Sequence, residues 1–117
     1  MTDGEHMVRV LACRVDEAAA VEEMADTKEA AQQLVGGYFA AWPLVRDDRG
    51  ELVLYCNEEG EGHELPFNRE VRNGRGEARR IVGPFYFGRV VDGGAAVSLS
   101  GDDVATCRAL MMQRQPE

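Results

Sequence analysis

Cys56 and His63 are the residues of this chain whose types could support nucleophilic or metal-dependent chemistry. They lie seven positions apart, at the end of an apolar run and in the polar stretch after it. Either chemistry needs a third group close by, a base or a further ligand. His6, the other histidine, is in the N-terminal tail, and no carboxylate is identifiably paired with His63. The pattern therefore favours a buried thiol beside an exposed imidazole, and we predict no catalytic residues.

The acidic stretch around His63 is a second candidate for chemistry. Its carboxylates belong to Glu58, Glu59, Glu61 and Glu64. They could hold a hard cation such as Ca²⁺ or Mg²⁺, but they lack the alternating acidic positions and the terminal bidentate glutamate of an EF-hand loop. Neighbouring carboxylates in a loop also have no defined separation, so a general acid and base cannot be assigned. We predict a solvated acidic loop, with neither a metal nor a cofactor.

A cluster of arginines follows the acidic stretch. Its members are Arg69, Arg72, Arg75, Arg79 and Arg80. Guanidinium groups bind carboxylates and phosphates through paired hydrogen bonds. The turn at 74–76 lacks the spacing and the lysine of a P-loop. Two interpretations stay open: charge balance with the acidic stretch, which we favour, and an anion-binding site.

Composition predicts that these residues belong to one small globular domain spanning 1–117, with flexible tails at 1–6 and 114–117. The chain has 117 residues, of which 44% are hydrophobic and 29% are charged, enough for a single core. Its formal charge of -8 opposes binding to nucleic acid, which relies on clustered lysine and arginine. The partner is therefore expected to be a protein or a small molecule.

Cysteine spacing and hydropathy indicate the compartment. Cys13, Cys56 and Cys107 are widely spaced and form no CxxC pair, which favours reduced thiols. No apolar run approaches the roughly 20 residues that span a bilayer, and the N-terminus lacks the pattern of a signal peptide. We expect a cytoplasmic protein without a membrane partner.

The elements that position these residues begin with strands and a helix. Met7 to Val15 predicts a first strand, with which 21–24 can pair. Asp26 or Thr27 can cap a helix that runs through Val35, after which two glycines end it. Tyr38 to Val45 and Glu51 to Cys56 then predict a hairpin.

For the second half of the chain, the sequence predicts fewer strand pairings. Leu65 to Val71 is expected to be irregular or one helical turn, and Arg80 to Val91 one long strand with a bulge or edge position at Gly83-Pro84. Ala95 to Leu99 predicts a short strand, followed by a helix capped by Ser100 or Asp102.

These elements predict the fold class α+β: a single small domain with a mainly antiparallel sheet and two helices packed on one face. The apolar phase of the predicted elements should bury five side chains. They are Trp42, Leu54, Phe85, Phe87 and Leu110.

Several motifs resemble one uncharacterised family. They are the segments Leu34–Tyr38, Leu52–Gly60, Leu65–Arg69, Gly83–Phe87 and Ser98–Ser100. As a set they resemble the domain-of-unknown-function family DUF3846, common in bacteriophages and mobile elements of Gram-positive bacteria. The resemblance covers roughly Val21 to Met112, and the chain departs from the family at 61–64, where a more apolar and basic link is usual.

The resemblance implies a phage or phage-derived accessory protein and brings no catalytic residues. It draws attention to the polar groups after the strand at 51–56. The candidate ligand or partner residues are Asn57, Glu58, Glu59, Asn68 and Arg69. The alternative interpretation, that Asn57, Asn68 and Arg69 cap and bridge the loop, is slightly favoured.

We therefore expect a non-enzymatic accessory protein in the host cytoplasm, which binds a host protein or a small, anionic, nucleotide-like ligand. Counteracting host defence is one role open to such a protein. Two alternatives remain: a small enzyme acting on a nucleotide or metabolite, and an acidic mimic of nucleic acid. The oligomeric state is open, a homodimer included.

Overall fold

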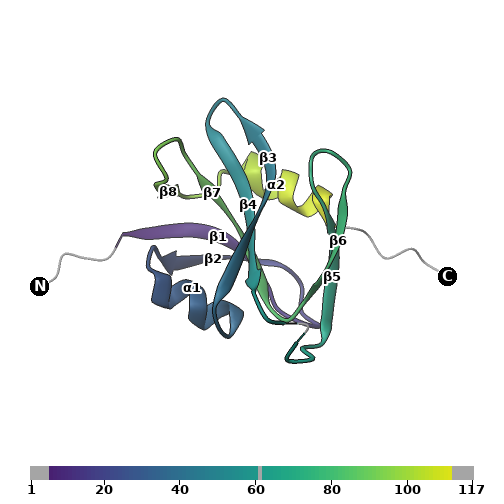
Figure 1. The fold of residues 1–117 in the computed structure, drawn as a ribbon. Coiled ribbons are helices and arrows are strands. Elements are labelled where there is room, and N and C mark those ends of the chain that lie inside the picture. Colours follow the sequence, from purple (N-terminus) through teal and green to yellow (C-terminus); the bar gives the residue numbers. More distant parts are fainter. Residues whose placement is uncertain (1–5, 61, 112–117) are drawn as a thin grey trace, which may run out of the picture.

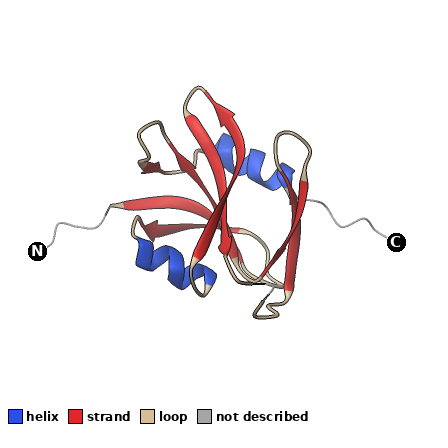
Figure 2. Ribbon diagram, viewed as in Figure 1, coloured by secondary structure: helices blue, strands red, loops and turns tan. Residues whose placement is uncertain are grey.

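A computed structural model describes residues 6–60 and 62–111 (Figures 1 and 2). Apart from His6, the tails expected to be flexible at 1–6 and 114–117 lie outside these residues. The elements are β1 (Met7–Cys13), β2 (Ala20–Ala25), α1 (Lys28–Val35), β3 (Phe39–Asp47), β4 (Gly50–Asn57), β5 (Phe67–Arg72), β6 (Ala78–Val82), β7 (Phe85–Val90), β8 (Ala96–Val97) and α2 (Gly101–Leu110).

The strands form a larger and a smaller antiparallel sheet. Five strands of the larger sheet have the order β2-β1-β7-β4-β3. The short strand β8 also belongs to this sheet and pairs with the end of β7. Strands β5 and β6 form a separate hairpin. The predicted α+β class with a mainly antiparallel sheet is confirmed.

The two helices lie on opposite faces of the larger sheet, so the prediction that both pack on one face was wrong. Phe85 and Phe87 point to the face that carries Cys107 of α2, whereas Tyr86 between them points to the face that carries Val35 of α1. The apolar run of β7 is buried on both sides. A strand covered on both faces has continuous rather than alternating hydrophobicity, and the apolar start of β7 is of this continuous kind.

Local signals place the helix ends. Thr27 Oγ1 accepts a hydrogen bond from the Ala30 amide, and Gly36 ends α1 in the left-handed conformation with φ of 83°. Ser100 and Asp103 form a capping box at the start of α2. Of the two candidates predicted for each cap, the structure has Thr27 rather than Asp26 and Ser100 rather than Asp102.

Two predictions for the second half were wrong. The segment expected to be irregular contains β5, and the expected long strand from 80 to 91 is divided into β6 and β7. The division falls at Gly83, which has φ of 75° and whose added Cβ would lie 2.6 Å from Leu65 Cδ1. This glycine turns the chain from the hairpin into the larger sheet, which a bulge within one strand would not do.

The predicted core is confirmed at Leu54, Phe85 and Phe87, which are 0% exposed. Trp42 and Leu110 are only partly buried and pack against that cluster from its margin. Trp42 lies on the edge strand β3, where the Arg79 guanidinium stacks 4.7 Å from the centre of its ring.

A buried ion network joins α2 to the larger sheet. Arg89, which is 3% exposed, donates to both carboxylate oxygens of Asp47 at 2.9 Å and to both of Asp103 at 2.9 and 3.0 Å. Arg49 reaches Asp103 at 3.3 Å. The hydrogen bonds from Arg89, with one from the Arg49 backbone amide at 2.9 Å, lower the pKa of Asp47 to about 2. Burial raises the pKa of Asp103, but the hydrogen bonds from Arg89 and the Ser100 amide outweigh it, so the net direction is downward.

This network predicts an acid-sensitive fold. A carboxyl group whose pKa is lower in the folded state stabilises the fold above its unfolded pKa, and that stability is lost as pH falls through the folded value. For Asp47 the window runs from 3.8 down to about 2. We expect the melting midpoint to fall over this range and Asp47→Asn to reduce the fall. A midpoint that falls equally in both proteins, measured by circular dichroism, would contradict the assignment.

Candidate functional site

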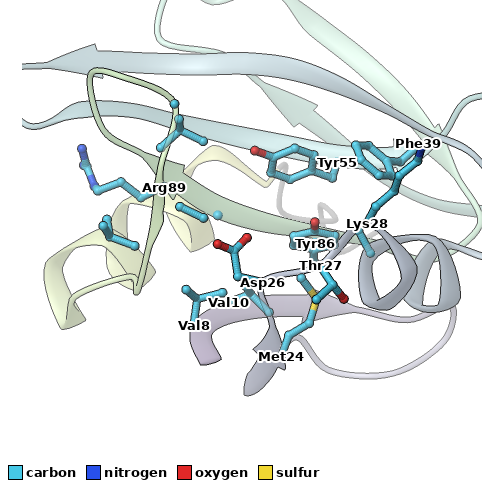
Figure 3. Close-up of a pocket in the computed structure, with 16 residues that line it drawn as sticks. Val8, Val10, Met24, Asp26, Thr27, Lys28, Phe39, Tyr55, Tyr86 and Arg89 are labelled. Atoms are coloured by element: carbon cyan, nitrogen blue, oxygen red, sulfur yellow. The ribbon is translucent and has the colours of Figure 1, made fainter. Parts of the chain in front are cut away.

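An open cavity of about 330 Å³ lies between α1 and the face of the larger sheet that α1 covers (Figure 3). Its walls are mostly apolar, and the helix side is made by the start of α1 and the residues before it. Among the lining residues are Val8, Val10, Met24, Asp26, Thr27, Lys28, Ala31, Phe39, Tyr55, Tyr86, Gly88 and Ala96. We call this cavity the tyrosine pocket.

Three aromatic rings from adjacent strands form one wall of the tyrosine pocket. Tyr55 and Tyr86 are register partners in β4 and β7, and their rings stack with centroids 4.8 Å apart at 19°. Phe39 of β3 meets Tyr55 edge-on at 5.8 Å and 80°. The rings are therefore held in place by strand register and by one another, as a preformed binding surface requires.

Gly88 is the reason that space remains beside these rings. It follows Tyr86 by two positions in β7, so it belongs to the same face of the sheet. An added Cβ would lie 3.5 Å from Tyr55 Cε2 and 3.8 Å from Tyr86 Cε2, which is ordinary contact. Alanine would thus fit at this position, whereas a longer side chain would project into the cavity.

The hydroxyl of Tyr86 is a polar group without a protein partner. Tyr86 is 5% exposed, and its hydroxyl forms no hydrogen bond with any of the described residues. No fully enclosed side-chain nitrogen or oxygen in that part of the chain lacks a partner, so this hydroxyl must be open to the cavity. Burial raises the pKa of the Tyr86 hydroxyl, and the nearby Tyr55 and Asp26 raise it further. Burial likewise raises the pKa of Tyr55, with smaller contributions from Asp26 and Glu51. Both hydroxyls stay protonated at neutral pH.

Charge at the tyrosine pocket comes from Asp26 and Lys28. In Figure 3 the Asp26 carboxylate points into the cavity, and Lys28 extends beside Phe39. Arg89 also lines the cavity, but its guanidinium points away from it, toward Asp47 and Asp103. A carboxylate is thus the charged acceptor available to a ligand.

The structure separates the site residues predicted from sequence into two groups. Asn57 is buried; its amide donates to the Val35 carbonyl at 3.2 Å and its carbonyl accepts from the Glu59 amide at 2.8 Å. It therefore fastens the end of α1 to the loop. Asn57, Glu58 and Glu59 line a second open cavity, of about 280 Å³, together with Arg79 and Arg80. This arrangement places the acidic stretch opposite part of the arginine cluster.

Asn68 and Arg69 join three other segments. The Asn68 amide donates to the carbonyls of Cys13 and Gly83, each at 2.9 Å. Arg69 donates to Asn68 Oδ1 and to the Glu17 carbonyl, each at 2.6 Å. The pair braces the end of β1 against the turn before β7.

These contacts predict a structural effect for Arg69→Ala. Removing charge-assisted hydrogen bonds to Asn68 and Glu17 should lower the unfolding free energy by about 1.5 kcal/mol. Arg75→Ala is the control, because Arg75 is exposed and should change stability by less than about 0.5 kcal/mol. Thermal melts of both variants would test this. An Arg69→Ala protein as stable as the control would reopen a ligand role for Arg69.

The cysteines are free and two of them are fully buried. Burial raises the pKa of Cys13 and of Cys107 to about 12 each, and also raises the pKa of Cys56. Thiols in this state are poor nucleophiles at neutral pH. His63 Nε2 lies 3.5 Å from Glu59 Oε1. The described residues contain no group of three or more His, Cys, Asp or Glu placed to hold a metal ion.

Comparison with known proteins assigns the family. The model described as Domain of unknown function (DUF3846) matches residues 8–112. The chain belongs to the DUF3846 family. The match includes β1 from its second residue on, and this strand lies outside the range in which the motifs show the resemblance. Searches of curated proteins and of solved structures found no match. Within the described residues of this DUF3846 chain, no helix is long and apolar enough to cross a membrane.

The pocket residues were not among those predicted from sequence. Tyr55 and Tyr86 lie within apolar strands, where a tyrosine is usually a core residue with a satisfied hydroxyl. The available signal was Gly88, a glycine inside a strongly apolar strand, because such a glycine often marks close approach of another group. From sequence, Asp26 is a candidate helix cap and nothing more.

Proposed function

We propose that this DUF3846 protein is a non-catalytic binding protein whose tyrosine pocket holds a planar ligand of nucleobase or nucleoside size. The observation that carries the proposal is the Tyr86 hydroxyl: the residue is 5% exposed, yet its hydroxyl has no partner among the described residues and borders a preformed aromatic cavity. Polar groups of buried residues are nearly always paired, so this hydroxyl is expected to bind water or a ligand.

The size and walls of the cavity support a small ring-containing ligand. A volume of about 330 Å³ lies at the lower end of the range for small-molecule sites, which are mostly apolar with a few placed polar groups. The planes of Phe39, Tyr55 and Tyr86 offer the contacts that ring systems favour.

The charge of the site supports a base or nucleoside over a phosphorylated nucleotide. Lys28 is the basic side chain available at the wall, while Asp26 and a formal charge of -8 repel phosphate. We therefore replace the small anionic ligand expected from sequence with an uncharged or cationic one. The position also moves, from the loop at 57–69 to the pocket beside α1.

A binding role agrees with the chemistry of the pocket. Catalysis would need an acid, a base and a nucleophile with suitable pKa values, whereas the raised pKa values of Tyr55 and Tyr86 keep both hydroxyls neutral. In a phage-type accessory protein of the host cytoplasm, we propose that the site withdraws a nucleoside-like compound and so counteracts host defence. A host-protein partner remains the alternative if no small ligand binds.

The proposal is tested by titrating nucleosides and bases against three proteins. The wild type should gain thermal stability with at least one compound, because a ligand that binds only the folded state stabilises it. Gly88→Leu should abolish that gain by filling the cavity. Gly88→Ala is the matched control and should retain the gain, since its Cβ makes only ordinary contacts. A gain that persists in Gly88→Leu, or no gain with any compound, would contradict the proposal.

A further inference from the structure

We infer that the tyrosine pocket selects planar ligands that carry an amidine-type or guanidine-type edge, whose two adjacent N–H groups donate to the Asp26 carboxylate. This inference rests on the proposed function and specifies the chemical class of its ligand. It follows from the placement of Asp26, from the groups around it and from the aromatic wall opposite.

The backbone around Asp26 is held in place before any ligand arrives. The Asp26 amide donates to the His6 carbonyl at 2.8 Å, and the next residue, Thr27, caps α1. In Figure 3 the carboxylate points into the cavity. It forms no hydrogen bond or ion pair with any of the described residues, so both of its oxygens are free to accept.

The groups that surround Asp26 leave its charge uncompensated. Tyr55 and Tyr86 are neutral, the Thr27 hydroxyl already accepts from the Ala30 amide, and Lys28 extends beside Phe39. No salt bridge joins Lys28 to Asp26 within the part of the chain that the structure describes. A cation entering the pocket would therefore find a carboxylate that no protein group neutralises.

Two features favour a flat, forked donor over a simple ammonium ion. A carboxylate binds two parallel N–H groups in a bidentate arrangement, which gives more directional contact than a single donor. Aromatic rings attract cations to their faces and pack well against planar groups. Amidinium, guanidinium and the N–H edge of guanine share this forked geometry, so the nucleobase that this chemistry would favour is guanine.

Three probes of matched shape test the inference: benzamidine, benzamide and benzoate. They differ in the group that meets Asp26, which is a forked cation, a neutral amide or an anion. Calorimetric titration of the wild-type protein should show benzamidine binding at least about tenfold more tightly than benzamide, and no measurable binding of benzoate.

Two substitutions show whether Asp26 causes the preference. Asp26→Asn should weaken benzamidine at least about tenfold while changing benzamide less than about threefold. Glu23→Gln removes the same charge from an exposed position of β2 that does not line the cavity, and should leave the preference unchanged. Equal losses in both variants would show a general charge effect and overturn the inference.

The outcomes separate this inference from the proposed function. Equal binding of benzamidine and benzamide, both lost in Gly88→Leu, would overturn the role of Asp26 and leave a binding pocket. Benzamidine binding that survives Gly88→Leu would place it outside the cavity and overturn the inference. Failure of every probe would also overturn it, and the nucleoside titration would then decide the proposed function separately.

Discussion

Phe87→Ala is expected to lower the unfolding free energy by about 3 to 5 kcal/mol, the range for truncating a large buried aromatic side chain. Phe87 is 0% exposed and lies in β7, between its register partners Leu11 in β1 and Leu54 in β4. Its ring meets that of Phe85 edge-on at 5.6 Å. The cavity left behind would thus open at the centre of the larger core cluster.

Such a loss is a large share of the roughly 5 to 15 kcal/mol that stabilises a typical domain. Urea denaturation of the two proteins would measure it. Tyr38→Ala is the control, because Tyr38 is 69% exposed and its truncation should cost less than about 0.5 kcal/mol. Equal urea midpoints for Phe87→Ala and the wild type would show that Phe87 is not part of the buried core.

Arg89→Met is the second large expected effect. The substitution retains an apolar stem but leaves Asp103, whose side chain is 4% exposed, without its main partner. Removing one member of a buried ion pair is strongly destabilising because the other charge stays buried. We expect a loss of about 3 kcal/mol, measured by the same denaturation.

Two further variants distinguish a network from a general packing effect. Combining Arg89→Met with Asp103→Asn should cost less than the two single changes added together, because the second change removes the uncompensated charge. Arg46→Met breaks the exposed pair between Arg46 and Asp92 and should cost less than about 1 kcal/mol. Additive losses at 89 and 103 would contradict the network.

Features with local causes could be predicted from sequence. The cap at Thr27, the left-handed Gly36 and the cap at Ser100 each depend on a few neighbouring residues, and the structure has all three. The hairpin of β3 and β4 also follows from a polar turn between apolar runs.

Features with long-range causes could not be predicted in this way. The divided strand depends on Gly83 meeting Leu65, and the placement of the helices on opposite faces depends on two-sided burial of β7. Arg89 illustrates the same limit, because its two carboxylate partners come from positions 42 and 14 residues away in the chain.

The tyrosine pocket could not be predicted from sequence for a related reason. The sequence predicts a site at polar residues in loops, yet Asn57, Asn68 and Arg69 use their polar atoms within the protein. The pocket instead depends on strand register, which places Tyr86 beside Tyr55, and on the missing side chain of Gly88. Register and empty space are both properties of the assembled sheet.

The central claim, that the tyrosine pocket is the ligand site, is tested most directly by mapping amide chemical-shift changes during a nucleoside titration. We expect the largest changes at Met24, Ala31, Tyr55, Tyr86 and Gly88, all of which line the cavity. Changes confined to 57–60 and 62–69 would instead place the ligand at the loop, and would contradict the account.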